Sequence, residues 1–427
     1  MPKQSFRFIG LALITILLIL GCQRFLVYPD LGDSGTNHPV TIKLSGWGSS
    51  PTEQQLFRQV LANFEDQHPT IRVKFEAIAE QYMDVIKTRL IGDAAPDVFF
   101  LDALEAPFLM ENNVLEPLNS YITPDFDLAD IEETLLRPFT LQNQIFGIPK
   151  DYSTLALFYN KQAFVDAGLD HPPVTWDELL VDAKQLTLDR NQNGRIDRYG
   201  LGMIPELARQ AYLIRSFGGQ VVDKQGYATF ASDAGLVGLE SLVTQYRDDR
   251  TSARPIDVGA NSGIEMFGQG KAAMAIEGNW AIPFFQDTFP NLEYGTAEVP
   301  RMNNQPGTMV YTVAYVMNRQ SQHKSEAWEL MAYLTGKTGM EQWTRSGLAL
   351  PTRKSVAETL QYDHDPLRSA LVAGVSYAMP WQVGNYPAAV MNQFNNQFIS
   401  VMLGEQSLQP AMLRAQEQAN QQIKAAE

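Results

Sequence analysis

The sequence predicts a two-lobed α/β protein, and three observations support this fold class. First, 427 residues with 45% hydrophobic content favour two or three domain-sized units over one. Second, strand-like and helix-like patterns alternate from Val40 onward, which is typical of a parallel sheet with helical crossovers. Third, the stretch Gly147–Lys161 holds two apolar runs separated by a short polar step. We therefore expect two separately packed bodies joined near this stretch.

We call Gly147–Lys161 the crossing segment, and its pattern predicts one strand that leads directly into another. Pro149 ends the first apolar run, because proline cannot donate to a sheet ladder. An exposed polar step should follow at 150–154, and a second apolar run resumes at Leu155. A chain that passes between two lobes in this way places polar side chains where a ligand is captured.

The composition describes a globular, acidic protein. The chain has 48 acidic and 33 basic residues, which gives a formal net charge of -15. Such a surface keeps a protein soluble and repels polyanions, so we expect no nucleic-acid partner.

The N-terminus carries an export signal. Lys3 and Arg7 precede an apolar run, Phe8–Leu20, that is too short for a bilayer span of roughly 20 residues. The run ends in Ile19-Leu20-Gly21-Cys22, which resembles a bacterial lipobox, with Leu20 as a mild departure from that pattern. We therefore expect a lipoprotein signal peptide at 1–21, lipidation of Cys22 and a tether at 22–39. The alternative is an uncleaved N-terminal anchor, which also leaves the folded part outside the cytoplasm.

Cys22 is the only cysteine in the chain. Disulfides and cysteine metal sites are therefore excluded from the folded part of the protein.

The first third of the chain predicts a β-α-β-α-β order. Ser50-Pro51-Thr52-Glu53 forms a capping box with proline at the first helical position, and Leu56, Val60, Leu61 and Phe64 line one face of that helix. The expected elements are a strand at Val40–Leu44, the helix after Ser50, a strand at Ile71–Phe75, a helix at Tyr82–Leu90 and a buried strand at Asp97–Leu101.

The remaining chain predicts further strands and helices in both lobes. Thr175 should cap a helix that begins at Trp176. The other expected elements are a strand at Met309–Met317, helices at Ala327–Leu334 and Gly339–Arg345, a helix carrying Met391, Phe394, Phe398 and Met402, and a last helix from Leu408.

Several segments in order resemble the extracellular solute-binding proteins of ATP-binding cassette importers, in the branch of maltose and glycerol-phosphate binders. The resemblance covers almost the whole chain from Val40. The segments are Ala95-Pro96-Asp97-Val98, Leu115-Glu-Pro-Leu118, Tyr159-Asn160-Lys161, Ala167-Gly168-Leu169 with Pro173 and Thr175–Glu178, Phe267–Met274 with Gly278 and Trp280, and Leu350-Pro351-Thr352-Arg353.

This resemblance implies a two-lobed periplasmic-binding-protein fold whose lobes close around a solute by hinge bending. Each lobe would be assembled from separate segments, 40–151 plus 308–350 for the first and 152–307 plus 351–427 for the second. It also implies a monomer without cofactor that binds a small sugar or polyol and meets the permease subunits of an importer.

The candidate ligand residues are aromatic, carboxylate and hydroxyl side chains, which suit sugar recognition. Trp280 matches the tryptophan of the family's G-x-W segment and Trp47 follows a strand end between two glycines; core packing is the alternative for Trp280. Asp102 ends the third strand, with helix capping as its alternative. Asp151, Tyr152 and Ser153 lie in the crossing segment, so at least one should face the cleft.

Six further candidates rest on weaker arguments. Tyr82 reaches the cleft from a helix start, although half-buried support is its commoner role. Arg353 would clamp a hydroxyl pair, carboxylate or phosphate, with a surface ion pair as its alternative. Four more match regions that line the family's cleft: Glu206, Tyr311, Trp381 and Tyr386.

One loop imitates a calcium site. Asp189, Asn191, Asn193 and Asp197 occupy positions 1, 3, 5 and 9 of a calcium loop, but Gly200 stands at position 12, where a bidentate glutamate belongs. We therefore expect a tight turn here and no metal.

Two other functions remain open on the sequence alone. A secreted hydrolase needs only two suitably placed carboxylates, but neither H-E-x-x-H nor G-x-S-x-G occurs. A solute-sensing envelope protein would use the same fold without transport. We expect a binding protein and no enzyme.

Overall fold

The computed structural model describes residues 39–48 and 50–427. The predicted signal peptide, Cys22 and nearly all of the predicted tether lie outside these residues. Within the described ranges, no helix has the length and hydrophobicity that a bilayer span requires.

The first third of the described chain has the predicted β-α-β-α-β order. Its elements are β1 (Val40–Gly46), α2 (Pro51–Gln67), β2 (Ile71–Ala77), α3 (Tyr82–Ile91) and β3 (Val98–Asp102). The Ser50 hydroxyl accepts a hydrogen bond from the Glu53 amide at 3.1 Å, which caps α2 as predicted. Phe57, and not Leu56, is buried on the inner face of α2.

A series of short elements connects β3 to the crossing segment. They are α4 (Ala106–Glu111), the 3-10 turns η1 (Pro124–Phe126) and η2 (Leu128–Asp130), α5 (Glu133–Leu136), η3 (Arg137–Phe139), and the hairpin β4 (Thr140–Leu141) and β5 (Gln144–Ile145).

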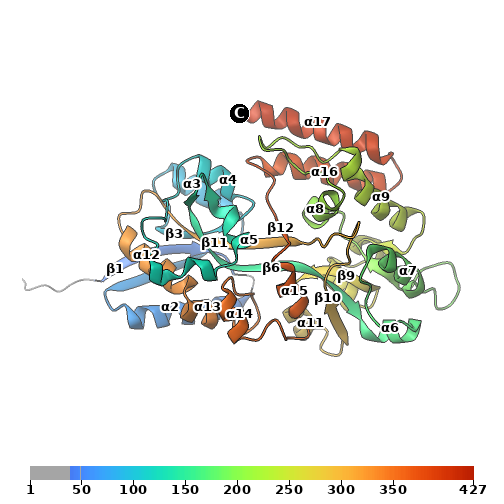
Figure 1. Ribbon diagram of the computed structural model, residues 1–427, viewed down its shortest axis with the longest axis horizontal. Helices are drawn as coiled ribbons and strands as arrows, with labels where there is room; N and C mark the ends of the chain where they lie inside the picture. Colours follow the sequence, from blue (N-terminus) through green and yellow to red (C-terminus); the bar gives the residue numbers. More distant parts are fainter. Residues whose placement is uncertain (1–38, 49) are drawn as a thin grey trace, which may run out of the picture. The chain divides into compact units, whose positions relative to one another are not determined.

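The crossing segment forms one continuous strand, β6 (Gly147–Asn160), and not the two predicted strands (Figure 1). Pro149 is accommodated because the pairing with β11 (Met309–Met317) shifts register there, so that one residue of β6 is left out of the ladder. The polar step is largely buried and not exposed as predicted; Lys150 is only 5% accessible. The reason is that β6 lies inside the sheet, with strands on both sides.

The strands form a ten-stranded mixed sheet. Its main order is β2-β1-β3-β11-β6-β9-β7-β8, with β10 and β12 paired to β6 and β11. The pairs β1/β3, β7/β8 and β7/β9 are parallel, whereas β11 and β6 are antiparallel to each other and to β3 and β9. β6 pairs with β11 up to Thr154 and with β9 from Leu155, so this one strand joins the two halves of the sheet.

The second half of the sheet and its helices come from the middle of the chain. These elements are α6 (Lys161–Ala167), α7 (Trp176–Leu186), β7 (Tyr199–Gly202), α8 (Leu207–Ser216), α9 (Asp233–Arg247), β8 (Ser252–Ala253), η4 (Pro255–Val258), α10 (Gly263–Gly268), β9 (Ala272–Gly278), α11 (Ala281–Thr288) and β10 (Tyr294–Ala297). The predicted cap at Thr175 is confirmed, and it is a capping box with Glu178.

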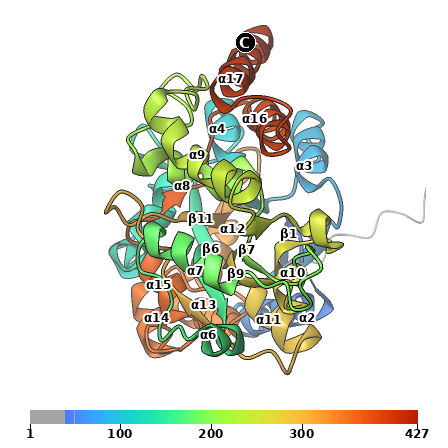
Figure 2. The same ribbon diagram turned by 90° about the vertical axis from the view of Figure 1, so that its right-hand side faces the viewer.

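The last part of the chain returns to both halves. After β11 come α12 (Lys324–Thr335), α13 (Lys337–Thr344), α14 (Lys354–Thr359), α15 (Ser369–Gly374), β12 (Met379–Pro380), α16 (Pro387–Met402) and α17 (Leu408–Ala426). The helices α16 and α17 pack side by side (Figure 2).

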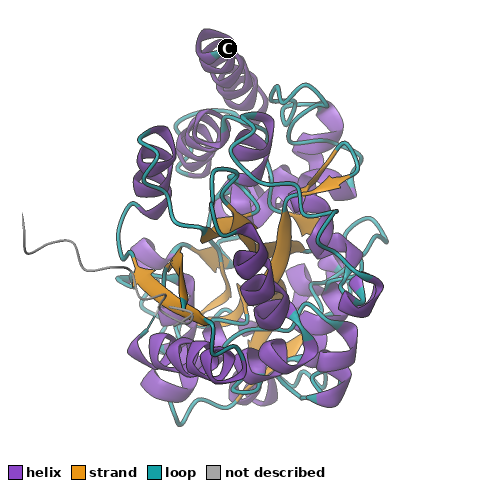
Figure 3. Ribbon diagram, turned by 90° about the vertical axis from the view of Figure 1, so that its left-hand side faces the viewer, coloured by secondary structure: helices purple, strands orange, loops and turns teal. Residues whose placement is uncertain are grey.

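Separate hydrophobic cores lie in the two halves, with helices around the strands (Figure 3). One core contains Phe99, Leu101 and Val316, whereas another contains Trp176 and Phe394. The fold is therefore two-lobed, as predicted. The predicted lobe boundaries stay a prediction.

Candidate functional site

A cavity of about 190 Å³ lies where β6 and β11 run together, and we call it the cleft cavity. It brings together six of the twelve predicted ligand residues: Trp47, Asp151, Tyr152, Ser153, Trp280 and Tyr311. Seven other residues complete its lining: Glu53, Lys150, Asn279, Val313, Trp343, Leu348 and Ala349.

Strand register explains why the central residues share this cavity. Tyr311 lies opposite Ser153, and Val313 lies opposite Asp151, in the β11–β6 pair. Tyr311 and Val313 are two residues apart, so their side chains leave the same face of β11. Trp280 follows the end of β9 and Trp47 follows the end of β1, so both enter from strand ends.

Trp280 is held in place from several directions. Its Nε1 donates to Glu277 Oε2 at 3.1 Å, and the Arg209 guanidinium lies 5.0 Å from its ring centroid. Arg209 also pairs with Glu277 at 3.1 Å, although Glu277 is almost fully buried. Burial raises the pKa of the Glu277 carboxyl, which the Arg209 charge opposes. Tyr311 contacts the Trp280 ring edge-on at 5.7 Å.

Gly278 makes this arrangement possible. A Cβ atom at this position would lie 2.4 Å from the Trp280 ring and 2.6 Å from Ser153 Oγ. Only glycine therefore allows the indole to lie against the crossing strand.

Asp151 is the acceptor at the centre of the cavity. Its Oδ2 accepts from Trp343 Nε1 at 3.0 Å and pairs with Lys150 Nζ. The Lys150 ammonium also lies 4.1 Å from the Trp343 ring centroid. The Lys150 and Asp151 side chains are only 5% and 16% exposed, so this charge pair is largely removed from water.

Ser153 and Asn279 form a polar corner. Ser153 Oγ accepts a hydrogen bond from the backbone amide of Asn279 at 2.8 Å. The side-chain Nδ2 of Asn279 donates to the carbonyls of Gly347 and Leu348 at 3.0 and 3.2 Å. Asn279 Oδ1 is buried and has no hydrogen-bond partner among the described residues. A buried unpaired acceptor is costly, so this oxygen is suited to a ligand hydroxyl.

Trp47 forms the wall on the β1 side. Its ring packs edge-on against the rings of Tyr82 and Phe100, at centroid distances of 4.9 and 5.4 Å. Gly46 is needed because a Cβ there would meet the Phe100 ring at 2.4 Å. The Tyr82 hydroxyl lies 3.0 Å from the carbonyls of Ser45 and Phe100 and accepts from the Phe100 amide. Tyr82 thus supports Trp47 and does not line the cavity.

Asp102 lies beside the cavity without lining it. It pairs with Val313 across β3 and β11, on the side of Val313 opposite to Asp151. Its Oδ1 accepts from the backbone amide of Leu104 at 2.8 Å, in the turn before α4. The N-cap residue of α4 is Glu105, so Asp102 is not the helix cap given as its alternative. Burial raises the pKa of Asp102 to about 6, and the charges of Glu105 and Asp151 act in the same direction.

Four predicted residues lie away from the cleft cavity. Arg353 is 1% exposed, and its guanidinium donates to the carbonyls of Thr335, Asp127 and Phe126. It also pairs with the Asp130 carboxylate, so its ion pair is buried and not at the surface. Trp381 is buried in the core of the second half of the sheet.

The Tyr386 hydroxyl donates to the Ala426 carbonyl at 3.2 Å, which fixes Tyr386 to the end of α17. Glu206 is the N-cap residue of α8, three positions before Arg209, and makes no side-chain cap.

The sequence reasoning missed Lys150, Asn279 and Trp343. Lys150 and Asn279 are direct neighbours of predicted residues, so adjacency was an available signal. Trp343 is 192 residues from Asp151 along the chain, and its helical pattern indicated only a core face.

The loop at Asp189 forms a tight turn, as predicted. Asp189 accepts from the amides of Asn193 and Gly194, Asn191 accepts from the Asn193 amide, and Asp197 accepts from the Arg190 amide. Among the described residues, no three His, Cys, Asp or Glu side chains are grouped as a metal site would require.

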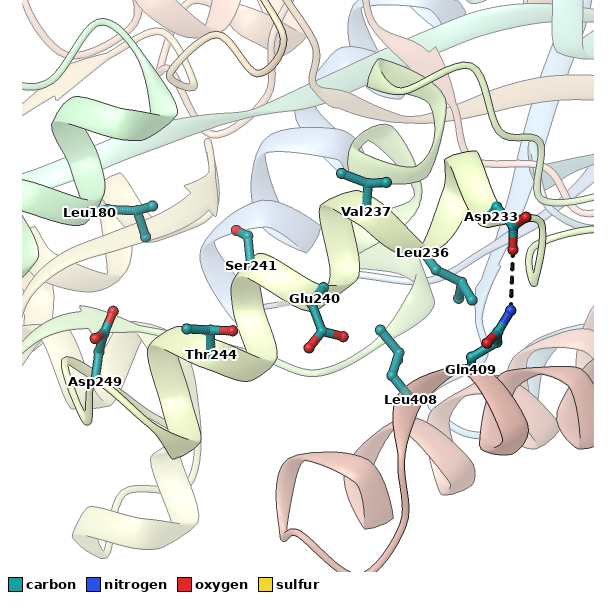
Figure 4. A pocket seen from close by; sticks show the side chains of 10 residues that line it. All are labelled: Leu180, Asp233, Leu236, Val237, Glu240, Ser241, Thr244, Asp249, Leu408 and Gln409. Atoms are coloured by element: carbon teal, nitrogen blue, oxygen red, sulfur yellow. Dashed lines mark hydrogen bonds between the residues drawn. The ribbon is translucent and has the colours of Figure 1, made fainter.

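A larger pocket of about 500 Å³ follows α9 on the second half of the chain (Figure 4). It holds none of the predicted residues, and no tryptophan lines it. The lining residues are Leu180, Asp233, Leu236, Val237, Glu240, Ser241, Thr244, Asp249, Leu408 and Gln409. The cleft cavity is the better candidate because aromatic and polar groups from separate elements converge there.

The sequence and the fold are both similar to those of known proteins. Residues 48–341 match the model of the family described as bacterial extracellular solute-binding proteins. The galactooligosaccharide-binding protein of Bacillus subtilis is 24% identical over 391 residues, which cover 86% of this chain and 86% of that protein.

Two solved structures have similar folds. An ABC transporter solute-binding protein of Thermotoga lettingae, bound with α-D-tagatose, has a TM-score of 0.73 and 25% identity, and covers 90% of this chain and 99% of its own. An ABC substrate-binding protein of Listeria monocytogenes, in complex with cycloalternan, has a TM-score of 0.79 at 20% identity, with 90% and 99% covered. The second likeness shows the fold alone.

Proposed function

The chain belongs to the family of bacterial extracellular solute-binding proteins, and from this premise we propose that it captures a neutral sugar for an importer. Family membership makes it an exported binding protein and not a hydrolase. The finer statements, on the solute, the mechanism and the membrane anchor, are our proposals.

The observation that carries the choice of a sugar is the lining of the cleft cavity. Three tryptophans line it, Trp47, Trp280 and Trp343, and aromatic faces pack on the C–H surfaces of sugar rings. The Asp151 carboxylate and the unpaired Asn279 Oδ1 accept hydrogen bonds from hydroxyl groups. The B. subtilis and T. lettingae proteins bind sugars by their descriptions, which agrees with this choice.

The charges favour a neutral sugar over a phosphorylated one. The cations at the cavity are already paired, Lys150 with Asp151 and Arg209 with Glu277. A phosphate would have to break one of these pairs, and an uncompensated buried charge is costly.

The mechanism we propose is closure of the lobes around the sugar. Trp47 follows β1 in the first half of the sheet, and Trp343 contacts Phe57 of the neighbouring helix α2. Trp280, in contrast, follows β9 of the second half. A ligand that touches both sets is bound more tightly when the lobes close, and only such a difference in affinity drives closure. The importer would then recognise the closed lobes and receive the sugar.

A ligand panel tests the proposal. Thermal shift and intrinsic tryptophan fluorescence would be measured with neutral mono- and oligosaccharides, polyols and sugar phosphates. We expect at least one neutral sugar to raise the melting temperature and change the fluorescence, because binding to the folded state stabilises it. A response to sugar phosphates alone would contradict the neutral class, and no response to the whole panel would contradict the sugar.

We also propose that Cys22 carries a lipid that holds the protein, as a monomer, at the outer side of the cell membrane. The lipobox-like run Ile19–Cys22 supports this. Labelled fatty acid should enter the wild-type chain in cells and not the Cys22→Ala variant. Equal labelling of both would overturn the assignment.

A further inference from the structure

A second pocket, distinct from the cleft cavity, lies between η1 and the α12–α13 turn. It has a volume of about 540 Å³, and its lining includes Phe126, Trp328, Tyr333, Asp125, Asp127 and Lys337. We call it the α12 pocket. We propose that it is a second binding site for a neutral saccharide. Only the class of ligand rests on the proposed function, because no residue of the α12 pocket lines the cleft cavity.

Trp328 and Phe126 form an aromatic wall on one side of the α12 pocket, with their ring centroids 5.3 Å apart. Tyr333 lies five residues after Trp328 on α12 and lines the pocket from another side, where its ring packs against Phe64. All three side chains are partly exposed at a concave surface. Apolar faces left open in a hollow mark a binding site more often than scattered surface residues do, and aromatic faces suit the C–H side of a sugar ring.

Polar groups surround these rings. Asp127 pairs with Lys337 at 3.4 Å, whereas the Asp125 carboxylate is exposed and has no side-chain partner among the described residues. Carboxylates accept hydrogen bonds from hydroxyl groups, and a lysine ammonium donates hydrogen bonds to hydroxyl oxygens. Both cations on the lining are paired, Lys337 with Asp127 and Arg353 with Asp130. This pairing favours a neutral saccharide over a sugar phosphate.

Arg353 links two sides of the α12 pocket. Its Nη groups donate to the carbonyls of Phe126 at 2.8 Å and Asp127 at 2.9 Å, and its Nε donates to the Thr335 carbonyl at 2.5 Å. The guanidinium also lies 4.8 Å from the Phe126 ring centroid. One buried side chain thus ties the turn that carries Phe126 to the helix that carries Tyr333. A site built in advance loses less entropy when its ligand binds.

Two variants of the full chain test this inference. Trp328→Ala removes the aromatic wall, and Ala332→Leu fills the pocket from α12 with a residue that favours helices. The matched variant in the cleft cavity is Trp280→Ala. Maltotriose, mannotriose and cellotriose serve as probes, at concentrations up to tens of millimolar. Binding is followed by saturation-transfer NMR on the ligand and by titration calorimetry, with circular dichroism as the check of folding.

We expect the Trp280→Ala protein to retain weak binding of at least one probe. Adding either Trp328→Ala or Ala332→Leu to Trp280→Ala should weaken this residual binding at least tenfold. Either single variant should leave binding in the cleft cavity unchanged. Residual binding that ignores both variants, or no residual binding in folded Trp280→Ala protein, would overturn the second site. If the Trp328→Ala protein bound sugar normally but cells that carry it lost sugar uptake, the second site would also be overturned, because the pocket would then serve the importer. If the cleft cavity binds no sugar while the α12 pocket does, the proposed function fails and this inference stands.

Discussion

The cleft cavity and the α12 pocket contain the same types of side chain, but the lysine–aspartate pair is largely buried in the first and exposed in the second. Each combines tryptophan with a lysine–aspartate pair. In the cleft cavity, the Lys150 and Asp151 side chains are 5% and 16% exposed, whereas Lys337 and Asp127 in the α12 pocket are 58% and 48% exposed. The first pair lies on β6, the strand inside the sheet that joins its two halves, and the second lies at the surface.

This difference in exposure gives the two lysine–aspartate pairs different roles. A buried pair is costly to break because the remaining charge has little water around it, whereas a surface pair is worth little. We infer that the Lys150–Asp151 pair fixes the crossing strand and the cavity together. The Lys337–Asp127 pair only shapes the rim of its pocket.

The largest expected effect is on stability. Asp151→Asn should lower the free energy of unfolding by about 3 kcal/mol, because Lys150 then keeps a buried charge without its partner. The exposed counterpart, Asp127→Asn, should cost less than about 1 kcal/mol. Urea unfolding of both variants at pH 7 measures this difference. Equal losses in the two variants would break the comparison.

The next effect is on affinity. Trp280→Ala should weaken binding of the sugar found in the ligand panel by at least about thirtyfold, or about 2 kcal/mol, because buried aromatic anchors dominate binding. Trp328→Ala should leave this affinity within about twofold, since its ring lies in the other pocket. Calorimetry with both proteins measures the two values. Unchanged affinity in the Trp280 variant would remove this residue from the site.

A third effect depends on pH and concerns Asp102, the half-buried carboxyl beside the cleft cavity. The pKa of Asp102 is raised from 3.8 to about 6 in the folded protein, so folding favours its protonated form. Its contribution to stability is present below pH 4 and is lost as the pH rises through 6.

Asp102→Asn should therefore stabilise the protein above pH 6, by between about 1 and 3 kcal/mol, with no gain below pH 4. The asparagine oxygen keeps the bond to the Leu104 amide. Urea unfolding at several pH values from 4 to 7.5 measures the difference. A gain that does not change with pH would show that burial of the charge is not its cause.

The smallest effect concerns the rim of the α12 pocket. Lys337→Gln should change the free energy of unfolding by less than about 0.5 kcal/mol, and about 1 M salt should abolish even this difference. Thermal unfolding at low and high salt measures it. A loss as large as that of Asp151→Asn would show that the surface pair is structural.

Local patterns in the sequence determined most of the elements of this protein. The strand at Met309–Met317 has the predicted bounds, the capping box at Thr175 is present, and the last two helices fall where the apolar spacing placed them. These features depend on hydrogen bonds and side-chain spacing within a few residues. The resemblance to the family also anticipated the fold.

Only the tertiary structure decided which side chains meet in the cleft cavity and which are buried. The shift in pairing at Pro149 keeps β6 continuous and buries Lys150, and a register between two strands cannot be read from either strand alone. Trp343 reaches Asp151 across 192 residues of chain. Arg353 spends its donors on distant carbonyls instead of on a ligand. Such contacts depend on how separate elements pack, because each side chain finds its partners only after the chain has brought them together.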